Sequence, residues 1–379
     1  MKKVLSLVFN NFKNDSRVLK ECTSLQTAGY HVRIVALHEG DLPVKEQIRG
    51  IVVDRILLKT RSLPKNLPCQ LIKYCELTFK ILKVGLFYQK TDIIHCNDLG
   101  PLPIAVTMKL LSGGKIKIVY DAHELETEQE SKPNPFRHFM SVLSEKVLIH
   151  HADVVITVSN GIAKEYVKRY GIPEPVLVLN CPPFNEVFPA DCFRETFNIS
   201  NKKTIFLYQG GLSPGRGVEL LLETFHQLDR KDAVLIIMGY GPLESLVREA
   251  GEKCNRIFYY PAVPPEELAE YTASADVGIS IIENTCLSYY YCLPNKLFEY
   301  AMAGLPVIIN DLPEMRHLME KYQCGVICCG EKKENLVQAI ERMLAANLSL
   351  LGQNARKMAR DYNWSVQETK LLQVYEDLS

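Results

Sequence analysis

Short hydrophobic runs alternate with amphipathic helical segments along almost the whole chain. In the first half, the runs that predict strands are residues 3–9, 31–37, 92–95, 117–120, 154–158 and 176–179. In the second half, they are residues 204–208, 233–238, 256–260, 277–281 and 305–309. Since parallel strands require a crossover connection, usually a helix, this alternation predicts an α/β fold with parallel sheets.

The alternation is interrupted by Asn180-Cys-Pro-Pro and a turn-rich segment that ends near residue 203. Clusters of proline and turn residues are typical of domain boundaries. A chain of 379 residues is long enough to bury two separate cores. We therefore predict a first domain of residues 1–185, joined by a terminal helix at about 362–379, and a second domain of residues 200–361.

Composition and charge narrow the class of protein. Lysine plus arginine equals aspartate plus glutamate at 44 each, so the overall charge does not favour nucleic acid. The basic, hydrophobic start lacks a small-residue cleavage site, which predicts a strand and not a signal peptide, and no run is long enough to span a bilayer. The 12 cysteines form no CxxC pair, which indicates reduced thiols and a cytoplasmic protein. Cys324, Cys328 and Cys329 have no nearby histidine, so we predict no metal site there.

A helix that opens directly out of a loop is the leading candidate for a binding site. The pattern predicts a helix over residues 295–303, which Gly304 ends. Its first turn carries Asn295 and Lys296. Because a lysine beside the positive end of a helix dipole is unfavourable by itself, it indicates an anion at this point, and phosphate is the usual one. Glu299, one turn further on, is either part of this site or an ordinary solvated residue.

Glycine-rich turns follow two other strands of the second domain. The first turn contains Gly210, Gly211 and Arg216, and the second is Gly239-Tyr-Gly-Pro242. Glycine permits close approach of the backbone to a ligand, and arginine can bridge phosphate oxygens. Because the carboxyl ends of parallel strands meet at one edge of a sheet, these turns are expected beside the start of the candidate helix.

Polar residues also cluster behind two neighbouring strands of the first domain. Asp98 follows the strand at 92–95, and His123 follows the strand at 117–120. Two such clusters on successive strands predict a ligand site at this edge.

The connection after the first strand bears Asp15 and Arg17 and lacks the GxGxxG pattern of nicotinamide and flavin sites. Asp15 either caps the following helix or faces the site. Arg17 lies in the first turn of that helix, where an acid is more favourable, and is either structural or directed towards the cleft.

An amphipathic, basic helix is predicted at about residues 70–88. Lys73, Lys80 and Lys83 outnumber the single acid, Glu76. This pattern is typical of contact with an anionic membrane surface around residues 70–90, and an ordinary surface helix is the alternative.

The order and spacing of these motifs resemble family 4 glycosyltransferases of the GT-B fold. The stretches that carry the resemblance are Asp15-Ser-Arg-Val-Leu-Lys-Glu21, Tyr120-Asp-Ala-His-Glu124, Thr157-Val-Ser159, Tyr208-Gln-Gly-Gly-Leu212, Gly239-Tyr-Gly-Pro242, Pro294-Asn-Lys-Leu-Phe-Glu-Tyr300 and Gly304-Leu-Pro-Val-Ile308. The resemblance implies two Rossmann-like domains facing across a cleft, with the donor nucleotide in the second and the acceptor mainly in the first. It also implies that the last helix crosses back to the N-terminal domain.

The resemblance assigns roles residue by residue. Glu299 matches an acid that holds ribose hydroxyls, while Tyr291 stands where the family has another acid and Gly211 where it has an arginine. We expect Lys296 to supply the missing charge. The catalytic positions are His123, Arg216, Lys296 and Glu299. The donor-binding positions are Gly210, Gly211, Leu212, Arg216, Gly239, Gly241, Pro242, Ala262, Val263, Tyr291, Asn295, Lys296, Leu297 and Glu299, and the acceptor-side positions are Asp15, Arg17, Asp98 and His123.

The expected activity is transfer of a sugar, with retention of configuration, from a UDP- or GDP-sugar to a hydroxyl acceptor. No metal or other cofactor is expected. The acceptor is expected to be a surface glycan or a lipid-linked intermediate at the inner face of the cell membrane, and a small soluble acceptor is an alternative. Two other classes stay open, a non-catalytic nucleotide-sugar-binding protein and a GT-B-type epimerase or phosphorylase-like enzyme.

Overall fold

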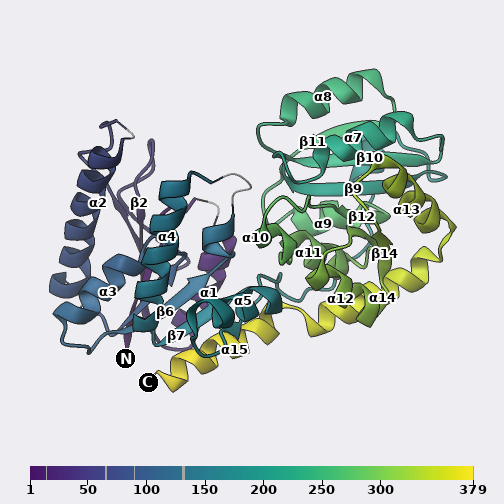
Figure 1. Cartoon of the computed structure of the whole chain (residues 1–379). Coiled ribbons are helices and arrows are strands. Elements are labelled where there is room, and N and C mark those ends of the chain that lie inside the picture. The colour runs from purple at the N-terminus through teal and green to yellow at the C-terminus, as the bar shows by residue number, and fades with distance from the viewer. Residues whose placement is uncertain (14, 65, 89, 130–132, 379) are drawn as a thin grey trace. The chain divides into compact units, whose positions relative to one another are not determined.

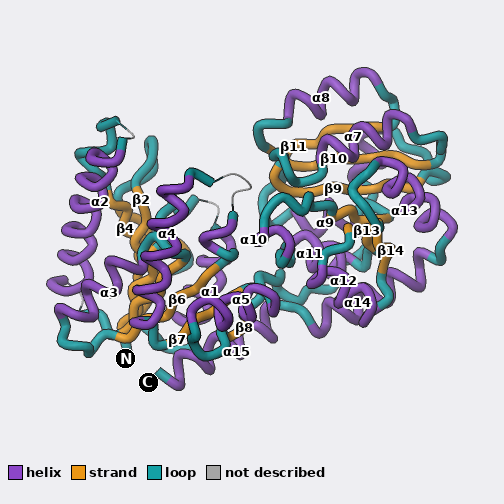
Figure 2. The backbone as a smooth tube through the Cα atoms, in the orientation of Figure 1, coloured by secondary structure: helices purple, strands orange, loops and turns teal. Residues whose placement is uncertain are grey.

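The computed structural model describes residues 1–13, 15–64, 66–88, 90–129 and 133–378. The chain forms two compact units, each built on its own sheet (Figures 1 and 2). Unit 1 comprises Met1–Leu179 and Glu368–Ser379, and unit 2 comprises Asn180–Gln367.

Unit 1 contains an eight-stranded sheet with the order β3-β4-β2-β1-β5-β6-β7-β8. The strands are β1 (Lys3–Leu7), β2 (His31–Leu37), β3 (Lys45–Ile48), β4 (Ile51–Ile56), β5 (Ile93–Asn97), β6 (Lys117–Ala122), β7 (Val154–Thr157) and β8 (Val176–Leu177). The predicted parallel pairing is correct except at β3, which is antiparallel to β4. The sequence pattern did not predict this hairpin because β3 is short and mostly polar, and Arg49 and Gly50, both with positive φ, make the turn.

Helices pack against both faces of this sheet and bury its hydrophobic strands. They are α1 (Ser16–Thr27), α2 (Leu67–Leu82), the π-helical turn η1 (Lys83–Tyr88), α3 (Leu102–Leu111), η2 (Glu126–Glu128), α4 (Pro135–Leu148), η3 (Ile149–His151) and α5 (Asn160–Tyr170). Helix α3 contacts both α2 and α4, so these three helices form one layer (Figure 1).

Unit 2 contains a six-stranded sheet, parallel throughout, with the order β11-β10-β9-β12-β13-β14. The strands are β9 (Thr204–Gly211), β10 (Ala233–Tyr240), β11 (Ile257–Pro261), β12 (Val277–Ser280), β13 (Val307–Asn310) and β14 (Gly325–Cys328). The helices are α6 (Cys192–Phe197), α7 (Val218–Gln227), α8 (Glu244–Lys253), α9 (Leu268–Ala273), α10 (Leu287–Tyr290), α11 (Asn295–Ala303), α12 (Pro313–Tyr322), α13 (Lys333–Ala345) and α14 (Leu348–Asp361). A continuous hydrophobic core joins the strands to α7 and α13.

The segment between the two predicted domains is packed, not open chain. It contains α6, which contacts α9 of unit 2. Phe193 is buried there, and the Arg194 guanidinium pairs with Asp276 at 2.7 Å. These contacts tie the segment to unit 2.

The last helix, α15 (Trp364–Asp377), begins among residues of unit 2 and ends among residues of unit 1. Its final two turns bury Leu371, Val374 and Tyr375, and Lys2 Nζ donates to the Leu378 carbonyl at 3.2 Å. Among the described residues, no helix combines the length and hydrophobicity that crossing a membrane requires.

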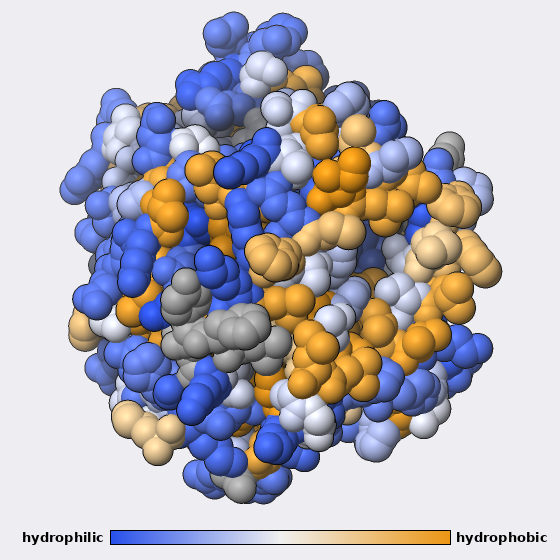
Figure 3. Space-filling view, turned by 90° about the vertical axis from the view of Figure 1, so that its left-hand side faces the viewer, coloured by the Kyte–Doolittle hydropathy of each residue, from blue (hydrophilic) through white to orange (hydrophobic). Residues whose placement is uncertain are grey.

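The outward face of α2 carries large hydrophobic side chains, which the predicted basic pattern did not single out. Lys73 Nζ donates to the Leu63 carbonyl at 2.7 Å, and Lys80 pairs with Glu76 at 2.6 Å. The large side chains exposed along this helix are Leu67, Leu71, Ile72 and Phe79. The space-filling view of the side that carries α2 shows hydrophobic patches between the polar groups (Figure 3). Sequence pattern alone missed this because it does not reveal which lysines fold back onto carbonyl oxygens.

Candidate functional site

In unit 1, the predicted site residues follow adjacent parallel strands. Strands β5 and β6 are paired up to Asn97 and Asp121, so the residues that follow them share one edge. Asp98 has a φ of 68°, a strained conformation for a residue other than glycine. Its carboxylate accepts a hydrogen bond from the backbone N–H of His123 at 3.3 Å, which links the two turns.

The centre of this edge is a buried ion pair between Arg17 and Asp121. Arg17 Nη2 lies 2.7 Å from Asp121 Oδ1 and Nε lies 3.1 Å from Oδ2, a two-pronged contact. Arg17 Nη1 also donates to the Val178 carbonyl at 2.9 Å. Arg17 is only 4% exposed, so of the two alternatives left open by the sequence the structural one applies, and the guanidinium does not face an open cleft.

The His123 ring contacts the Asp121 carboxylate, which has a large effect on the pKa of the ring. Its Nε2 is 3.1 Å from Asp121 Oδ2, and its Nδ1 is 3.4 Å from Asp98 Oδ1. Burial by itself lowers the pKa of His123, but the charge and hydrogen bond of Asp121, with Asp98, raise that pKa to about 9. At neutral pH the ring is therefore an imidazolium, a hydrogen-bond donor through both nitrogens.

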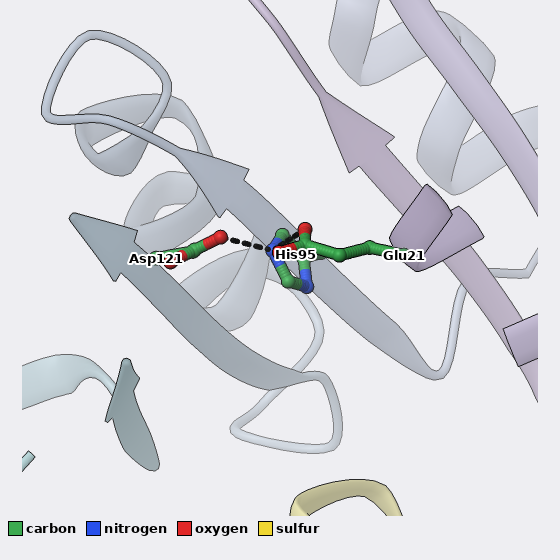
Figure 4. A group of neighbouring side chains, drawn as sticks. All are labelled: Glu21, His95 and Asp121. Atoms are coloured by element: carbon green, nitrogen blue, oxygen red, sulfur yellow. Dashed lines mark hydrogen bonds and ion pairs between the residues drawn. The ribbon is translucent and has the colours of Figure 1, made fainter. Parts of the chain in front are cut away.

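The side chains of Glu21, His95 and Asp121 converge from α1, β5 and β6 (Figure 4). One ligand atom from each lies within 4.8 Å of the others, the only such grouping among the described residues that could hold a metal. However, Arg17 Nε is 3.0 Å from Glu21 Oε1 and also pairs with Asp121. The guanidinium thus already places one positive charge between these two carboxylates. Burial, only partly offset by Arg17, raises the pKa of Glu21 to about 7.

Asp15 has the capping role that the sequence left open. Its carboxylate accepts a hydrogen bond from the Val18 N–H at 3.1 Å and starts α1. Asn10 Nδ2 donates to the other carboxylate oxygen at 2.8 Å. Both oxygens are therefore used within the loop that leads into α1.

In unit 2, the predicted helix appears as α11 with the predicted bounds. Its N-cap residue is Pro294, no side chain caps it, and its first turn contains no acid. Lys296 projects from this turn, with Nζ 3.6 Å from the centre of the Tyr208 ring, a cation–π contact. Burial, followed by the nearby charge of Arg216, lowers the pKa of Lys296 to about 7. The helix start thus carries a positive dipole end beside two cations, Lys296 and Arg216, and the charge of Glu299 offsets them only in part.

Glu299 is held by a residue that the sequence analysis did not select. Gln209, at the end of β9, donates through Nε2 to Glu299 Oε2 at 2.6 Å. Its other amide atom, Oε1, accepts from the Thr272 hydroxyl at 2.9 Å. Gln209 is 2% exposed and orients the carboxylate. A polar side chain at the end of a buried strand was the available signal.

Arg216 lies in the loop after β9, with its guanidinium carbon 4.8 Å from the centre of the Tyr289 ring. Gly217 follows with a φ of 75°, and a Cβ at this position would lie 2.8 Å from the Ile281 carbonyl oxygen. Glycine is therefore required for the turn that brings Arg216 towards Lys296.

The glycines at the ends of β9 and β10 either allow two backbone segments to approach each other or leave open space beside the backbone. A Cβ at Gly239 would lie 1.9 Å from the Gly210 carbonyl oxygen, and one at Gly241 would lie 2.5 Å from that of Leu212. Gly239 and Gly241 thus allow the two backbones to approach each other. By contrast, a Cβ at Gly211 would meet nothing within 4 Å, so the space above this residue is open.

Two of the predicted donor positions have no free backbone N–H. The Leu212 N–H donates to the Tyr240 carbonyl at 2.9 Å, and the Leu297 N–H donates to the Pro294 carbonyl at 3.0 Å. The side chains of Leu212 and Leu297 are buried in the core. Their contribution is therefore to the shape of the site.

The other predicted donor positions lie on turns and loops of unit 2. Tyr291 directly follows α10, with its ring 4.9 Å from that of Tyr290. Ala262 directly follows β11, and Val263 is half-buried. Pro242 and Asn295 are exposed.

Comparison with known proteins identifies the family. The family model described as Glycosyltransferase Family 4 matches residues 16–182, and that described as Glycosyl transferases group 1 matches residues 203–346. A chitobiosyldiphosphodolichol beta-mannosyltransferase of Debaryomyces hansenii is 25% identical over 382 residues, covering 90% of this chain and 80% of the relative. A phosphatidyl-myo-inositol mannosyltransferase of Mycolicibacterium smegmatis is 25% identical over 387 residues, covering 96% and 90%.

Solved structures share the fold over the full length of the chain. Sucrose-phosphate synthase from Thermosynechococcus elongatus has a TM-score of 0.81 at 19% identity, and covers 100% of this chain and 99% of its own. Anabaena HepE in complex with UDP and glucose has a TM-score of 0.75 at 14% identity, with 100% of both chains covered. With two parallel-sheet units and both family models matched, the chain belongs to the family 4 glycosyltransferases and has the GT-B fold.

Proposed function

We propose that the protein transfers a sugar from a nucleoside-diphosphate sugar to a hydroxyl acceptor. The observation that carries this proposal is the start of α11, where Lys296 and Arg216 stand beside an uncapped helix N-terminus. This arrangement favours a ligand with at least two negative charges, and a diphosphate fits it. Glu299, one turn further on and oriented by Gln209, is suited to accept hydrogen bonds from ribose hydroxyls.

In the proposed reaction, the bond between the anomeric carbon and the diphosphate oxygen breaks while the bond to the acceptor oxygen forms. Arg216, Lys296 and the helix dipole stabilise the charge that develops on the departing diphosphate. Because these groups balance that charge, we propose that no metal is needed. Full activity in the presence of excess EDTA is the expected result, and loss of activity that Mg²⁺ or Mn²⁺ restores would contradict it.

His123 is proposed to donate a hydrogen bond to the sugar or the acceptor. With its pKa raised to about 9, the ring is already protonated at neutral pH and is a poor base. The acceptor proton then passes to the departing phosphate oxygen on the same face of the sugar, which predicts retention of configuration. NMR of the product formed early in the reaction measures the anomeric configuration, and an inverted product would exclude same-face attack. The anomeric configuration is worth measuring because the name of the Debaryomyces relative, a beta-mannosyltransferase, specifies a configuration.

The activity is tested by release of nucleoside diphosphate from a panel of nucleotide sugars, with and without acceptor extracts. The panel includes activated mannose, because two relatives are named mannosyltransferases, and UDP-glucose, with which HepE has been solved. Acceptor-dependent release supports the proposal. A non-catalytic binding protein would release nothing, and an epimerase would interconvert the sugars without acceptor.

We also propose that the acceptor is lipid-linked and reached at an anionic membrane surface. Helix α4 supports this, because its large exposed side chains follow helical spacing along one face. They are Phe136, Phe139, Met140, Leu143 and Val147. The opposite face is anchored by buried Glu145, which accepts hydrogen bonds from Tyr120 and Tyr170 at 2.6 Å each.

The charges of α4 suit the same surface. Arg137 and Lys146 are exposed beside the hydrophobic residues, whereas Glu145, the acid of this helix, is buried. A hydrophobic stripe flanked by cations matches the interface of an anionic bilayer. The exposed hydrophobic face of α2 lies in the same helix layer. Two relatives are named for phosphodolichol-linked and phosphatidylinositol substrates, which also favours a lipid acceptor.

Co-sedimentation with vesicles that contain phosphatidylglycerol tests this proposal. The double variant Phe136→Ser, Phe139→Ser should lose vesicle binding while keeping the donor affinity of the unaltered enzyme. Phe188→Ser is a matched control, because Phe188 is 75% exposed but belongs to unit 2. Equal binding by the double variant and the control would contradict the proposed surface.

A further inference from the structure

We propose that Tyr375 and His95 are positioning residues that set the orientation and protonation of the Asp121–His123 pair. This inference rests on the proposed role of His123 in the glycosyl transfer. It extends that role to Tyr375, a residue of the C-terminal helix. The sequence motifs do not include this helix, and the family matches end at residue 346.

The contacts form a continuous chain inside unit 1. The Tyr375 hydroxyl is 2.7 Å from His95 Nδ1. His95 Nε2 is 3.4 Å from Asp121 Oδ2, and the same oxygen is 3.1 Å from His123 Nε2. Tyr375, His95 and Asp121 are at most 2% exposed, so water does not compete for these bonds. The Tyr375 and His95 rings are also nearly parallel, at an interplanar angle of 11°.

The partners of His95 determine which of its nitrogens carries the proton. Nε2 faces two carboxylate oxygens, Asp121 Oδ2 at 3.4 Å and Glu21 Oε2 at 3.5 Å. A carboxylate accepts hydrogen bonds, so in the neutral ring Nε2 carries the proton and donates it. Nδ1 is then the acceptor, and the Tyr375 O–H is its donor. The tyrosine hydroxyl therefore stabilises one tautomer of His95, the one that donates to Asp121.

The Asp121 oxygen that faces His123 also faces two other hydrogen-bond donors. Its Oδ2 faces Arg17 Nε at 3.1 Å as well as His95 and His123. Although burial by itself raises the pKa of Asp121, the charges of Arg17 and His123 and the histidine hydrogen bonds hold that pKa well below its ordinary value. Each hydrogen-bond donor to Asp121 Oδ2 weakens the electrostatic attraction between Asp121 and His123. Removal of the His95 donor should therefore strengthen the Asp121–His123 bond and make His123 harder to deprotonate.

Several charged groups around His123 enter this balance. Asp121 and Asp98 favour the protonated ring, and Arg17 opposes it. Glu21 also interacts electrostatically with His123. Tyr375 and His95 act only through Asp121, because neither contacts His123 within the bonds described. They are thus positioning residues, and His123 is the group that meets the reacting molecules.

The test is the variant Tyr375→Phe in the full-length enzyme, with histidines labelled by ¹⁵N. We expect His95 to change from a single Nε2–H tautomer to a mixture, and the pKa of His123 to rise. The kcat should fall by about tenfold, the size typical of removing a partner that orients a functional histidine. Affinity for the nucleoside diphosphate should be unchanged, because the donor residues belong to unit 2.

Tyr170→Phe is the matched control. It also removes a buried tyrosine hydroxyl of unit 1, but one that bonds Glu145 at 2.6 Å. Both variants should lose thermal stability, whereas only Tyr375→Phe should alter the His95 tautomer and the His123 pKa. If both variants behave alike in these two measurements, the proposal is wrong.

Substitution of His95 provides a second test. His95→Leu removes the donor to Asp121, and His95→Gln keeps an N–H in a similar place. A recovery of kcat in the glutamine variant over the leucine variant supports a positioning role, and equal kcat values would overturn it. If the enzyme shows no transfer with any donor, the proposed function fails, but the tautomer and pKa measurements still decide this inference.

Discussion

The two clusters of charged residues are organised in opposite ways. In unit 1, Arg17 is paired with Asp121 and Glu21, and the side chains of all three are at most 5% exposed. In unit 2, Lys296 stands near a second cation, Arg216, and burial lowers its pKa to about 7. Unit 1 therefore pairs its cation with two carboxylates, while in unit 2 two cations lie near each other and the charge of Glu299 offsets them only in part.

This difference separates a structural charge cluster from a binding site. A buried ion pair is costly to disturb by removing one member, because the other charge is left buried without its partner. A cation whose pKa is lowered by burial and by a second cation is stabilised in its charged form when an anion binds beside it. Disturbing unit 1 should thus affect folding first, and disturbing unit 2 should affect ligand binding first.

The largest effect is expected from Asp121→Asn. This change leaves the Arg17 guanidinium buried beside only Glu21, so the free energy of unfolding should fall by about 3–5 kcal/mol. Urea denaturation measures this loss. Asp232→Asn is the control, because Asp232 forms an exposed pair with Arg230 and should cost about 1 kcal/mol or less. Equal losses would show that burial of the unit 1 cluster does not matter.

A smaller effect is expected from Glu299→Ala. It removes a carboxylate proposed to bind ribose, so donor affinity should fall about tenfold to a hundredfold, since hydrogen bonds to charged groups contribute about 1.5–3 kcal/mol. Calorimetric titration with nucleoside diphosphate measures this change. The melting temperature without ligand should also fall, because the buried Gln209 Nε2 loses its acceptor. Glu249→Ala, at an exposed position of α8, is the control. Unchanged affinity in Glu299→Ala would remove this residue from the donor site.

The smallest effect is a pH dependence that sharpens the contrast. A folded-state pKa of about 7 for Lys296, below the ordinary 10.5, means that the free site is about half protonated near neutral pH. A bound diphosphate raises this pKa, so binding takes up a proton above pH 7. Affinity should therefore weaken as pH rises above about 7, by at most about tenfold per pH unit.

The same shift acts on stability without ligand. Because the folded-state pKa is lowered, the contribution of Lys296 is fully present above pH 10.5 and is lost as pH falls through about 7. Nucleoside diphosphate should offset this loss. In Lys296→Gln, binding should be weaker and its pH slope shallower. An identical slope in the unaltered enzyme and in this variant would assign the titration to another group.

Much of the fold could be predicted from local pattern. Strand β2 and helix α11 have the bounds that hydrophobic periodicity and a terminal glycine indicated. The β3–β4 hairpin could not be predicted in this way, because a short polar edge strand has no hydrophobic run. Chemical type likewise selected Lys296, Glu299 and His123 as candidates, but it did not select Gln209 or Tyr208, whose roles depend on contacts distant in sequence.

The sequence by itself determined the class of this protein, because the order of its strands, turns and motifs is a property of the chain read residue by residue. Only the tertiary structure decided which charges are available to a ligand. Arg17 and Lys296 are both cations in the first turn of a helix. The fold places two carboxylates against Arg17, and an aromatic ring and another cation near Lys296. The physical reason is that the electrostatic energy of a charged group depends on its neighbours in space, and most of these are distant in sequence.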